Sequence, residues 1–270
     1  MGDTKKQQKK VRIHPKIRQR RSEVVKQKNK KRLGYLIALC VLLLALFAYI
    51  VVIYSPITQI TDIVIQGNQH ETDNQILIAG NLYAQKPQLF LLNYGQVEKQ
   101  IDALPWVMSS SIKRDWPNQI IITVTDRVAI AQINLGKLGY ALVDQFGRIL
   151  QIQSQPTPNL FEIDNLGSNL TAGQNLGSFA IGALNVAKIV PSILGPIAIK
   201  ETVQSDNSLS IVLGSNNTIY LGSANDIKEK LLEALAIVNH GSLLPNQTID
   251  VSIPNSPVVT SSSIVNSRKG

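Results

Sequence analysis

The sequence predicts an α+β protein: a single N-terminal transmembrane helix, a β-α-α-β-β unit, and a mostly antiparallel β-domain with two helices. Three observations lead to this prediction. An uncharged apolar stretch of 21 residues covers 33–53. Within 57–128, period-2 and helix-period segments alternate. Beyond that range, short apolar runs are separated by turns rich in Asn, Gly and Ser.

The apolar stretch has the length of a membrane-spanning helix. At 1.5 Å per residue, a helix of this length covers roughly 30 Å, the thickness of a bilayer's hydrocarbon core. A cleaved signal peptide is the alternative, but its apolar core is shorter, about 7–15 residues. A buried helix of a soluble protein would show a polar face. We therefore expect an uncleaved anchor at 33–54.

Charge predicts the orientation of this anchor. Residues 1–32 contain fourteen Lys and Arg and two acids, a net charge of +12, whereas the whole chain carries +9, so the remainder carries −3. Because basic flanks stay in the cytoplasm, the N-terminus is expected inside and the rest outside. Nucleic-acid binding is a weaker interpretation of the tail, since it lacks interleaved aromatic residues.

The first unit after the anchor is expected at 57–128. Residues 60–66 are predicted as a strand that ends at Gly67-Asn68, and Thr72-x-x-Gln75 forms a capping box at the start of a short helix. A second helix is expected at 95–103, followed by strands at 107–114 and 119–127 that are joined by a tight turn. We expect Trp106 and Trp116, which flank this hairpin, to pack on the sheet or its rim.

The second unit is expected at 129–256, before a flexible tail at 257–270. One helix is predicted to begin near Ser178 and to end at Pro191, and another lies between Ser223 and Gly241. Four charged residues of the second helix are predicted to face solvent: Lys228, Glu229, Lys230 and Glu233. The candidate strands are 129–135, 140–143, 148–152, 160–163, 198–204, 209–213, 218–221 and 248–253.

Four sequence fragments resemble the bacterial division protein family FtsQ, called DivIB in Gram-positive bacteria. They are IQGN (65–68), LPWV (104–107), KRDWPN (113–118) and LVDQFG (142–147). The resemblance is specific over roughly 57–150 and implies that the β-α-α-β-β unit is a POTRA domain. The residues that carry it, with expected structural roles, are Gly67, Asn68, Pro105, Trp106, Arg114, Trp116, Pro117, Asp144 and Gly147.

No catalytic or metal-binding motif stands out in the sequence. The only cysteine, Cys40, lies within the apolar stretch, and the three histidines are far apart. The G-x-S-x-G and K-T-G motifs are absent, and S-D-N occurs at 205–207 without the K-T-G that would complete a penicillin-recognising set. We therefore expect no cofactor, no metal and no small-molecule substrate. A membrane-tethered hydrolase or transferase with an unfamiliar site remains the alternative to an interaction scaffold.

The resemblance implies binding to two other single-pass division proteins, an FtsL-like protein and a DivIC/FtsB-like coiled-coil protein, with enrichment at the septum. The family's usual partner surface is formed by the last strands of the β-domain, here 218–221 and 248–259. The expected contact residues are Tyr220, Ile253, Pro254 and Val258, with Pro254 and Pro257 ending the edge. The alternative is that TIDVSI (248–253) is an interior strand.

Overall fold

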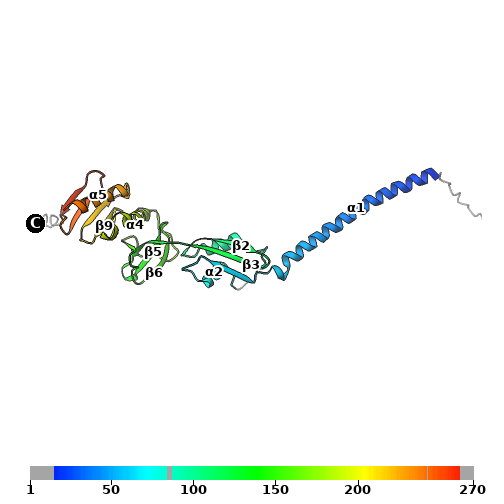
Figure 1. Ribbon diagram of the computed structural model, residues 1–270, viewed down its shortest axis with the longest axis horizontal. Coiled ribbons are helices and arrows are strands. Elements are labelled where there is room, and N and C mark those ends of the chain that lie inside the picture. Colours follow the sequence, from blue (N-terminus) through cyan, green and yellow to red (C-terminus); the bar gives the residue numbers. More distant parts are fainter. Residues whose placement is uncertain (1–14, 84–86, 242, 262–270) are drawn as a thin grey trace, which may run out of the picture.

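The molecule is elongated, and its parts follow one another along its long axis in chain order (Figure 1). The structure, a computed structural model, describes residues 15–83, 87–241 and 243–261. The first half of the basic tail (1–14) and the last residues of the C-terminal tail (262–270) lie outside the described residues. Helix α1 is at one end, a three-stranded unit follows it, and the β-domain with α5 and β9 is at the other end (Figure 1).

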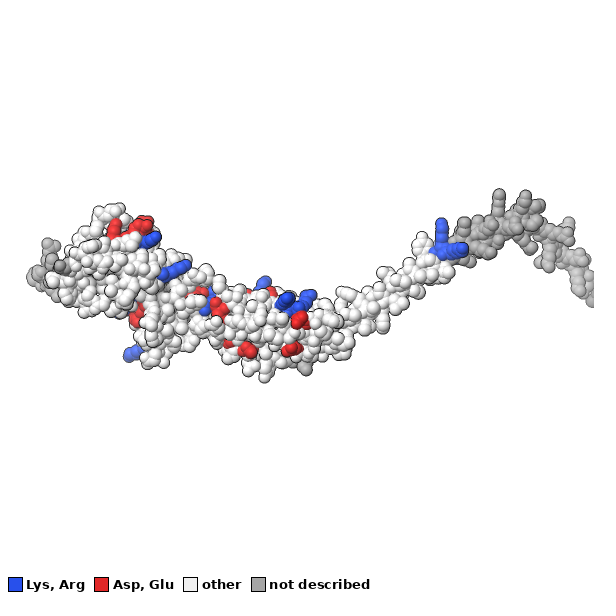
Figure 2. Space-filling model, viewed as in Figure 1, with Lys and Arg blue, Asp and Glu red and all other residues white. Residues whose placement is uncertain are grey.

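Helix α1 runs without a break from Pro15 to Tyr54. Its segment Lys30–Tyr54 is long and apolar enough to cross a membrane: an 18-residue stretch within it has a mean hydropathy of 3.2 and is not buried by the rest of the described chain. Figure 2 shows basic side chains at the start of the described surface of α1 and an uncharged surface from there to the next domain. This charge pattern is that of a membrane anchor.

The next unit has the predicted order β-α-α-β-β. Its elements are β1 (Asp62–Gln66), α2 (Asp73–Ala79), α3 (Tyr94–Ile101), β2 (Val107–Asp115) and β3 (Gln119–Asp126). The sheet order is β1-β3-β2, with β1 parallel and β2 antiparallel to β3. Both helices pack on this sheet, and the core includes Ile76, Val97 and Ile101 against Ile120 and Ile122.

The capping box predicted for α2 is present. The backbone N–H of Gln75 donates to the Thr72 hydroxyl at 3.3 Å, and the Thr72 backbone N–H donates to the Gln75 side chain at 2.8 Å. Trp116, in contrast, does not pack on the sheet: 70% of its surface is exposed, so that expectation was wrong. It lies in the β2–β3 turn beyond the end of the sheet, where no described element covers it.

The β-domain is built on one nine-stranded sheet. Its strands are β4 (Ala129–Asn134), β5 (Tyr140–Asp144), β6 (Ile149–Gln153), β7 (Phe161–Asp164), β8 (Ala198–Val203), β9 (Leu209–Leu213), β10 (Thr218–Gly222), β11 (Gln247–Asp250) and β12 (Val258–Ser261). The order is β12-β11-β10-β9-β8-β7-β4-β5-β6. Five of the eight pairings are antiparallel, so the predicted class, α+β with a mostly antiparallel β-domain, is confirmed.

Two helices, α4 (Ile181–Ile193) and α5 (Ile227–His240), pack against each other and against the sheet. Helix α4 extends two residues past Pro191, where the sequence predicts its end. The missing N–H of a proline removes only one hydrogen bond from this last turn. Lys230 was predicted to face solvent, but it is only 1% exposed.

A row of aligned side chains crosses the middle of the sheet beneath the helices. In register across six strands stand Ile133, Ile163, Glu201, Ile211, Ile219 and Ile249. All six are completely buried. Five are apolar, as the core face of a sheet requires, and Glu201 is the exception.

Candidate partner-binding edge and the domain junction

The sheet of the β-domain ends in an open strand, β12. Its residues pair antiparallel with β11, from Val258 opposite Asp250 to Ser261 opposite Gln247. On its other side, no described strand or loop pairs with it. A strand at a sheet edge presents unpaired backbone N–H and C=O groups to which another chain can bind.

The opposite edge of the same sheet is partly covered. There the segment 173–176 runs along the start of β6: Gly173 N–H donates to the Ile149 carbonyl, and Ile149 N–H donates to the Gln174 carbonyl, each at 2.8 Å. In the three-stranded unit, α3 covers the edge of β2, where the Ile112 N–H donates to Glu98 Oε1 at 2.8 Å. The β12 edge has no comparable cover among the described residues.

The residues predicted to contact partners lie at or near this edge, but not all on one strand. Val258 is on β12 itself and is 55% exposed, whereas Ile253 is 66% exposed in the loop after β11. Pro254 is half-buried in that loop. Tyr220 is two strands further in, on β10, and stands in one row with Asp250 and Val258. The structure thus gathers the four residues around one corner of the sheet.

The sequence missed the edge strand itself. Pro257 was expected to end the edge and to begin a flexible tail, but β12 follows directly after it. A proline that precedes the first residue of a strand costs no ladder hydrogen bond. The β-branched run Val258-Val259-Thr260 then pairs with β11. This run of β-branched residues was the available signal.

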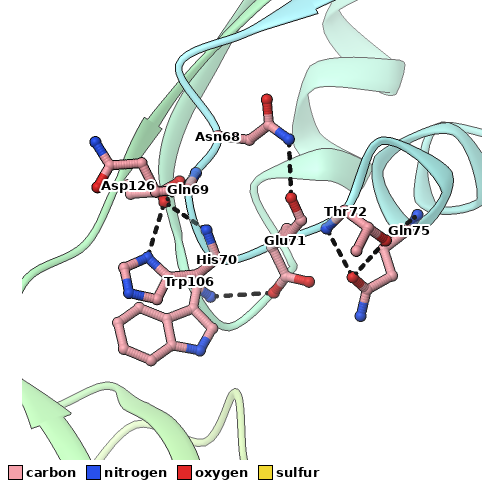
Figure 3. Close-up of polar contacts among 8 residues, drawn as sticks. All are labelled: Asn68, Gln69, His70, Glu71, Thr72, Gln75, Trp106 and Asp126. Carbon is pink, nitrogen blue, oxygen red and sulfur yellow. Dashed lines mark hydrogen bonds and ion pairs between the residues drawn. The ribbon is translucent and has the colours of Figure 1, made fainter.

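Five of the nine family-motif residues lie where the two domains meet, and four of these take part in the contacts described next. Gly67 ends β1 with φ +90°, and a Cβ atom there would lie 2.2 Å from the Val124 carbonyl oxygen, so only glycine fits. The Asn68 side chain donates to the Glu71 carbonyl at 2.9 Å, and the Trp106 backbone N–H lies 3.5 Å from Glu71 Oε1 (Figure 3).

Trp106 stacks on His70, with ring centroids 3.7 Å apart and planes 2° from parallel. Asp126 Oδ2 holds the His70 segment in place, since it accepts the backbone N–H of Gln69 at 2.8 Å and of His70 at 3.1 Å, and lies 3.0 Å from His70 Nδ1 (Figure 3). Trp106 is half-buried, so this tryptophan does pack at the rim of its domain.

Two arginines join the domains. Arg127 Nη1 lies 2.6 Å from the buried Asp144 Oδ2, and its Nε donates to the Val107 carbonyl. From the β-domain, Arg148 Nη2 donates to the Ala103 carbonyl at 2.6 Å. Burial, with a smaller effect of Arg127, lowers the pKa of Arg148. Asp144 therefore sits at the centre of the junction.

The remaining motif residues occupy other places. Gly147, in the turn after Asp144, has φ +82° and packs against Leu176 and Leu184. Arg114 lies over the ring of Tyr94 at 4.5 Å, and Pro117 follows Trp116 in a cis peptide bond. These last contacts are at the end of the three-stranded unit that adjoins α1.

A cavity of about 670 Å³ opens at the domain junction. Both domains line it, with His70, Trp106 and Asp126 on one side and Leu142 and Leu160 on the other. An Asp–His pair in a cavity resembles part of a hydrolytic triad, but within the described residues no hydroxyl or thiol is hydrogen-bonded to the His70 ring. The described residues also contain no cluster of metal-ligating side chains.

Known proteins resemble up to about three quarters of this chain. Residues 58–127 match the family model of the FtsQ-type POTRA domain. The cell division protein DivIB of Clostridium acetobutylicum is 27% identical over 213 residues, which cover 75% of this chain and 83% of that protein. The cell division protein FtsQ of Mycobacterium leprae is 25% identical over 205 residues, 76% of this chain and 57% of that protein.

The DivIB protein of Bacillus subtilis is 25% identical over 142 residues, which cover 53% of this chain and 51% of that protein. The matched region thus spans little more than half the length of the mycobacterial and Bacillus relatives. An FtsQ-type POTRA domain directly after one apolar helix, together with relatives that align beyond that domain, supports the similarity of this chain to the FtsQ/DivIB family of cell division proteins.

Proposed function

We propose that this chain is a non-catalytic scaffold of the bacterial division machinery, which binds other single-pass division proteins outside the membrane and helps to control septal wall synthesis. Its relatives are cell division proteins by name, and the His70–Asp126 pair lacks a nucleophile within the described residues. The observation that carries the proposal is the open β12 edge.

The proposed partners are an FtsL-like protein and a DivIC/FtsB-like coiled-coil protein. One of them would add an extended segment to β12, with backbone hydrogen bonds supplying affinity and side-chain contacts supplying specificity. Val258 and Ile253 offer exposed apolar contacts beside that edge. Tyr220 stands in the same row as Val258 and would extend the contact across the sheet face.

The proposal includes a topology and a division of the chain. Residues 1–32 would be cytoplasmic, 33–54 would span the membrane, and the POTRA domain (57–128) and β-domain (129–256) would lie outside, enriched at the septum. The net charge of +12 before the apolar stretch supports this orientation. The POTRA domain would offer a second surface for other division proteins.

A charge placed on the edge strand tests the proposal. Val258→Lys in the full-length, membrane-inserted chain should abolish capture of the co-expressed coiled-coil partner, because lysines on an edge oppose strand addition. Ile152→Lys is the matched control, since Ile152 is an exposed isoleucine on β6 at the opposite edge. Tyr220→Ala and Ile253→Glu should weaken capture.

Retained capture by a folded Val258→Lys protein would refute the β12 edge as the binding site. An equal loss of partner capture with Ile152→Lys would show that a charge on either edge of the sheet impairs capture, and that the β12 edge is not specifically required. Circular dichroism and protease resistance of each variant establish that it is folded. A Val258→Thr variant, which keeps the β-branched shape without charge, should still capture the partner.

A further inference from the structure

The end of helix α1 is fixed to the POTRA domain. Thr58 is buried, and its hydroxyl lies 3.2, 3.3 and 3.0 Å from the carbonyl oxygens of Val52, Ile53 and Ser55. The same hydroxyl is 2.9 Å from Gln88 Oε1. One side chain thus links the last turn of the membrane helix to a loop some thirty positions later in the POTRA domain.

That loop carries exposed apolar side chains. Its backbone pairs with the segment after α1, because Ile60 N–H donates to the Pro87 carbonyl at 2.9 Å and Leu89 N–H donates to the Thr58 carbonyl at 2.8 Å. Leu89 is buried, but the next two residues, Phe90 and Leu91, are 40% and 53% exposed. They face outward at the end of the domain where α1 arrives.

The β2–β3 turn lies at the same end. The Asn118 carbonyl accepts the backbone N–H of Thr61 at 3.0 Å, and the Asn118 side chain donates to the Thr61 hydroxyl at 2.5 Å. Trp116, two residues before Asn118, is the exposed tryptophan described above. Among the described residues, the Trp116 indole has no hydrogen-bond partner and no ring contact.

We propose that this end of the POTRA domain rests in the headgroup layer of the membrane that α1 crosses, through a rim formed by Ile57, Phe90, Leu91 and Trp116. Tryptophan is enriched at membrane interfaces because its ring is apolar and its N–H is polar. Continuity with the membrane helix places the rim there, since Ile57 follows Tyr54 by only three positions and is itself exposed.

The charged residues near the rim are of both signs, so they give it no preference for anionic over neutral lipid. Lys113 and Arg114 are followed by Asp115, and Asp62 lies on the neighbouring part of β1. Figure 2 shows basic and acidic side chains close together at this end of the domain. The rim therefore binds through its aromatic and apolar groups, and added anionic lipid should change little.

The two tryptophans of the chain permit a direct test. In Trp106→Phe the only remaining tryptophan is Trp116, which lies at the rim. In Trp116→Phe the only remaining tryptophan is Trp106, which lies at the opposite end of the POTRA domain. Each full-length variant is reconstituted in phosphatidylcholine vesicles with lipid brominated near the headgroup. Trp116 emission should be strongly quenched and shifted to shorter wavelength, whereas Trp106 emission should not respond to the bromine.

Equal insensitivity of both tryptophans to brominated lipid, with free quenching of Trp116 by aqueous iodide, would overturn the proposal. Shielding of Trp116 that requires a co-reconstituted division protein would also overturn it, in favour of a protein contact. Phe90→Ser with Leu91→Ser, in the Trp106→Phe background, should reduce the quenching of Trp116. An unchanged response in that variant would refute the rim as a unit.

Discussion

Replacing Glu201 should stabilise the β-domain, because this carboxyl group is buried among isoleucines without a partner. It is completely buried, and neither of its oxygens has a hydrogen-bond partner among the described residues. Ile163 and Ile211 flank it in register on the adjacent strands. Burial raises the pKa of Glu201 well above its usual value.

The expected magnitude follows from the unmade hydrogen bonds. A buried polar group without a partner costs about 1–3 kcal/mol, so Glu201→Leu should raise the unfolding free energy by about 2 kcal/mol at acidic pH. The gain should grow with pH. Because burial raises the pKa of Glu201 in the folded state, its burial costs least below the pKa of the unfolded chain, about 4.3, where the carboxyl group is protonated in both states. The cost then increases as the pH rises from there through the folded pKa, because a charged carboxylate must be buried.

Hydrogen exchange measured by mass spectrometry reports this region locally, in the full-length chain in detergent. Peptides that cover β8 and β9 should exchange more slowly in Glu201→Leu than in the unmodified protein, and the difference should be larger at pH 8 than at pH 5. Glu162→Leu is the control, since Glu162 is only half-buried on adjacent β7 and accepts a hydrogen bond from Asn134. A difference that is absent or independent of pH, after correction for intrinsic exchange, would refute the reasoning.

Three further changes test other parts of the structure. Asp144→Ala should destabilise the domain junction by about 3 kcal/mol in urea unfolding, because Arg127 is left without its buried partner; an effect below 1 kcal/mol would contradict this. Gly67→Ala should cost more than Gly136→Ala, since both have positive φ but only Gly67 meets a backbone oxygen; equal melting temperatures would argue against the close contact. Thr72→Ala should cost about 1 kcal/mol through loss of the helix cap, as a shift in the denaturation midpoint without a change in slope.

Local patterns account for most of what the sequence predicted correctly. The order of the POTRA elements follows from hydrophobic periods, the capping box and turn residues, all of which act within a few positions. Eight of the nine β-domain strands lie within or overlap the predicted ranges. Strand β12 is missed because Pro254 and Pro257 predict the end of the edge, whereas the strand begins directly after Pro257.

The environments of single charged or aromatic residues were harder to predict, since they depend on distant segments. Lys230 lies at a position that helical spacing assigns to solvent. Its ammonium group instead donates to the carbonyls of Leu221, on β10, and Ser223, in the turn before α5, at 2.9 and 3.0 Å. Trp116 shows the opposite error, because an aromatic residue beside a hairpin is usually buried. No local pattern in the sequence predicts the burial of Glu201.

The elongated arrangement in Figure 1 restricts how a partner can reach the open edge. Strand β12 belongs to the part of the molecule farthest from α1, with the POTRA domain between them (Figure 1). The arginines at the domain junction oppose folding of one domain back on the other. A partner anchored in the same membrane therefore needs an extended or stiff spacer as long as the POTRA domain before its binding segment begins. The distance between the bilayer and the β12 edge would therefore select partners whose spacer between membrane anchor and binding segment has a matching length.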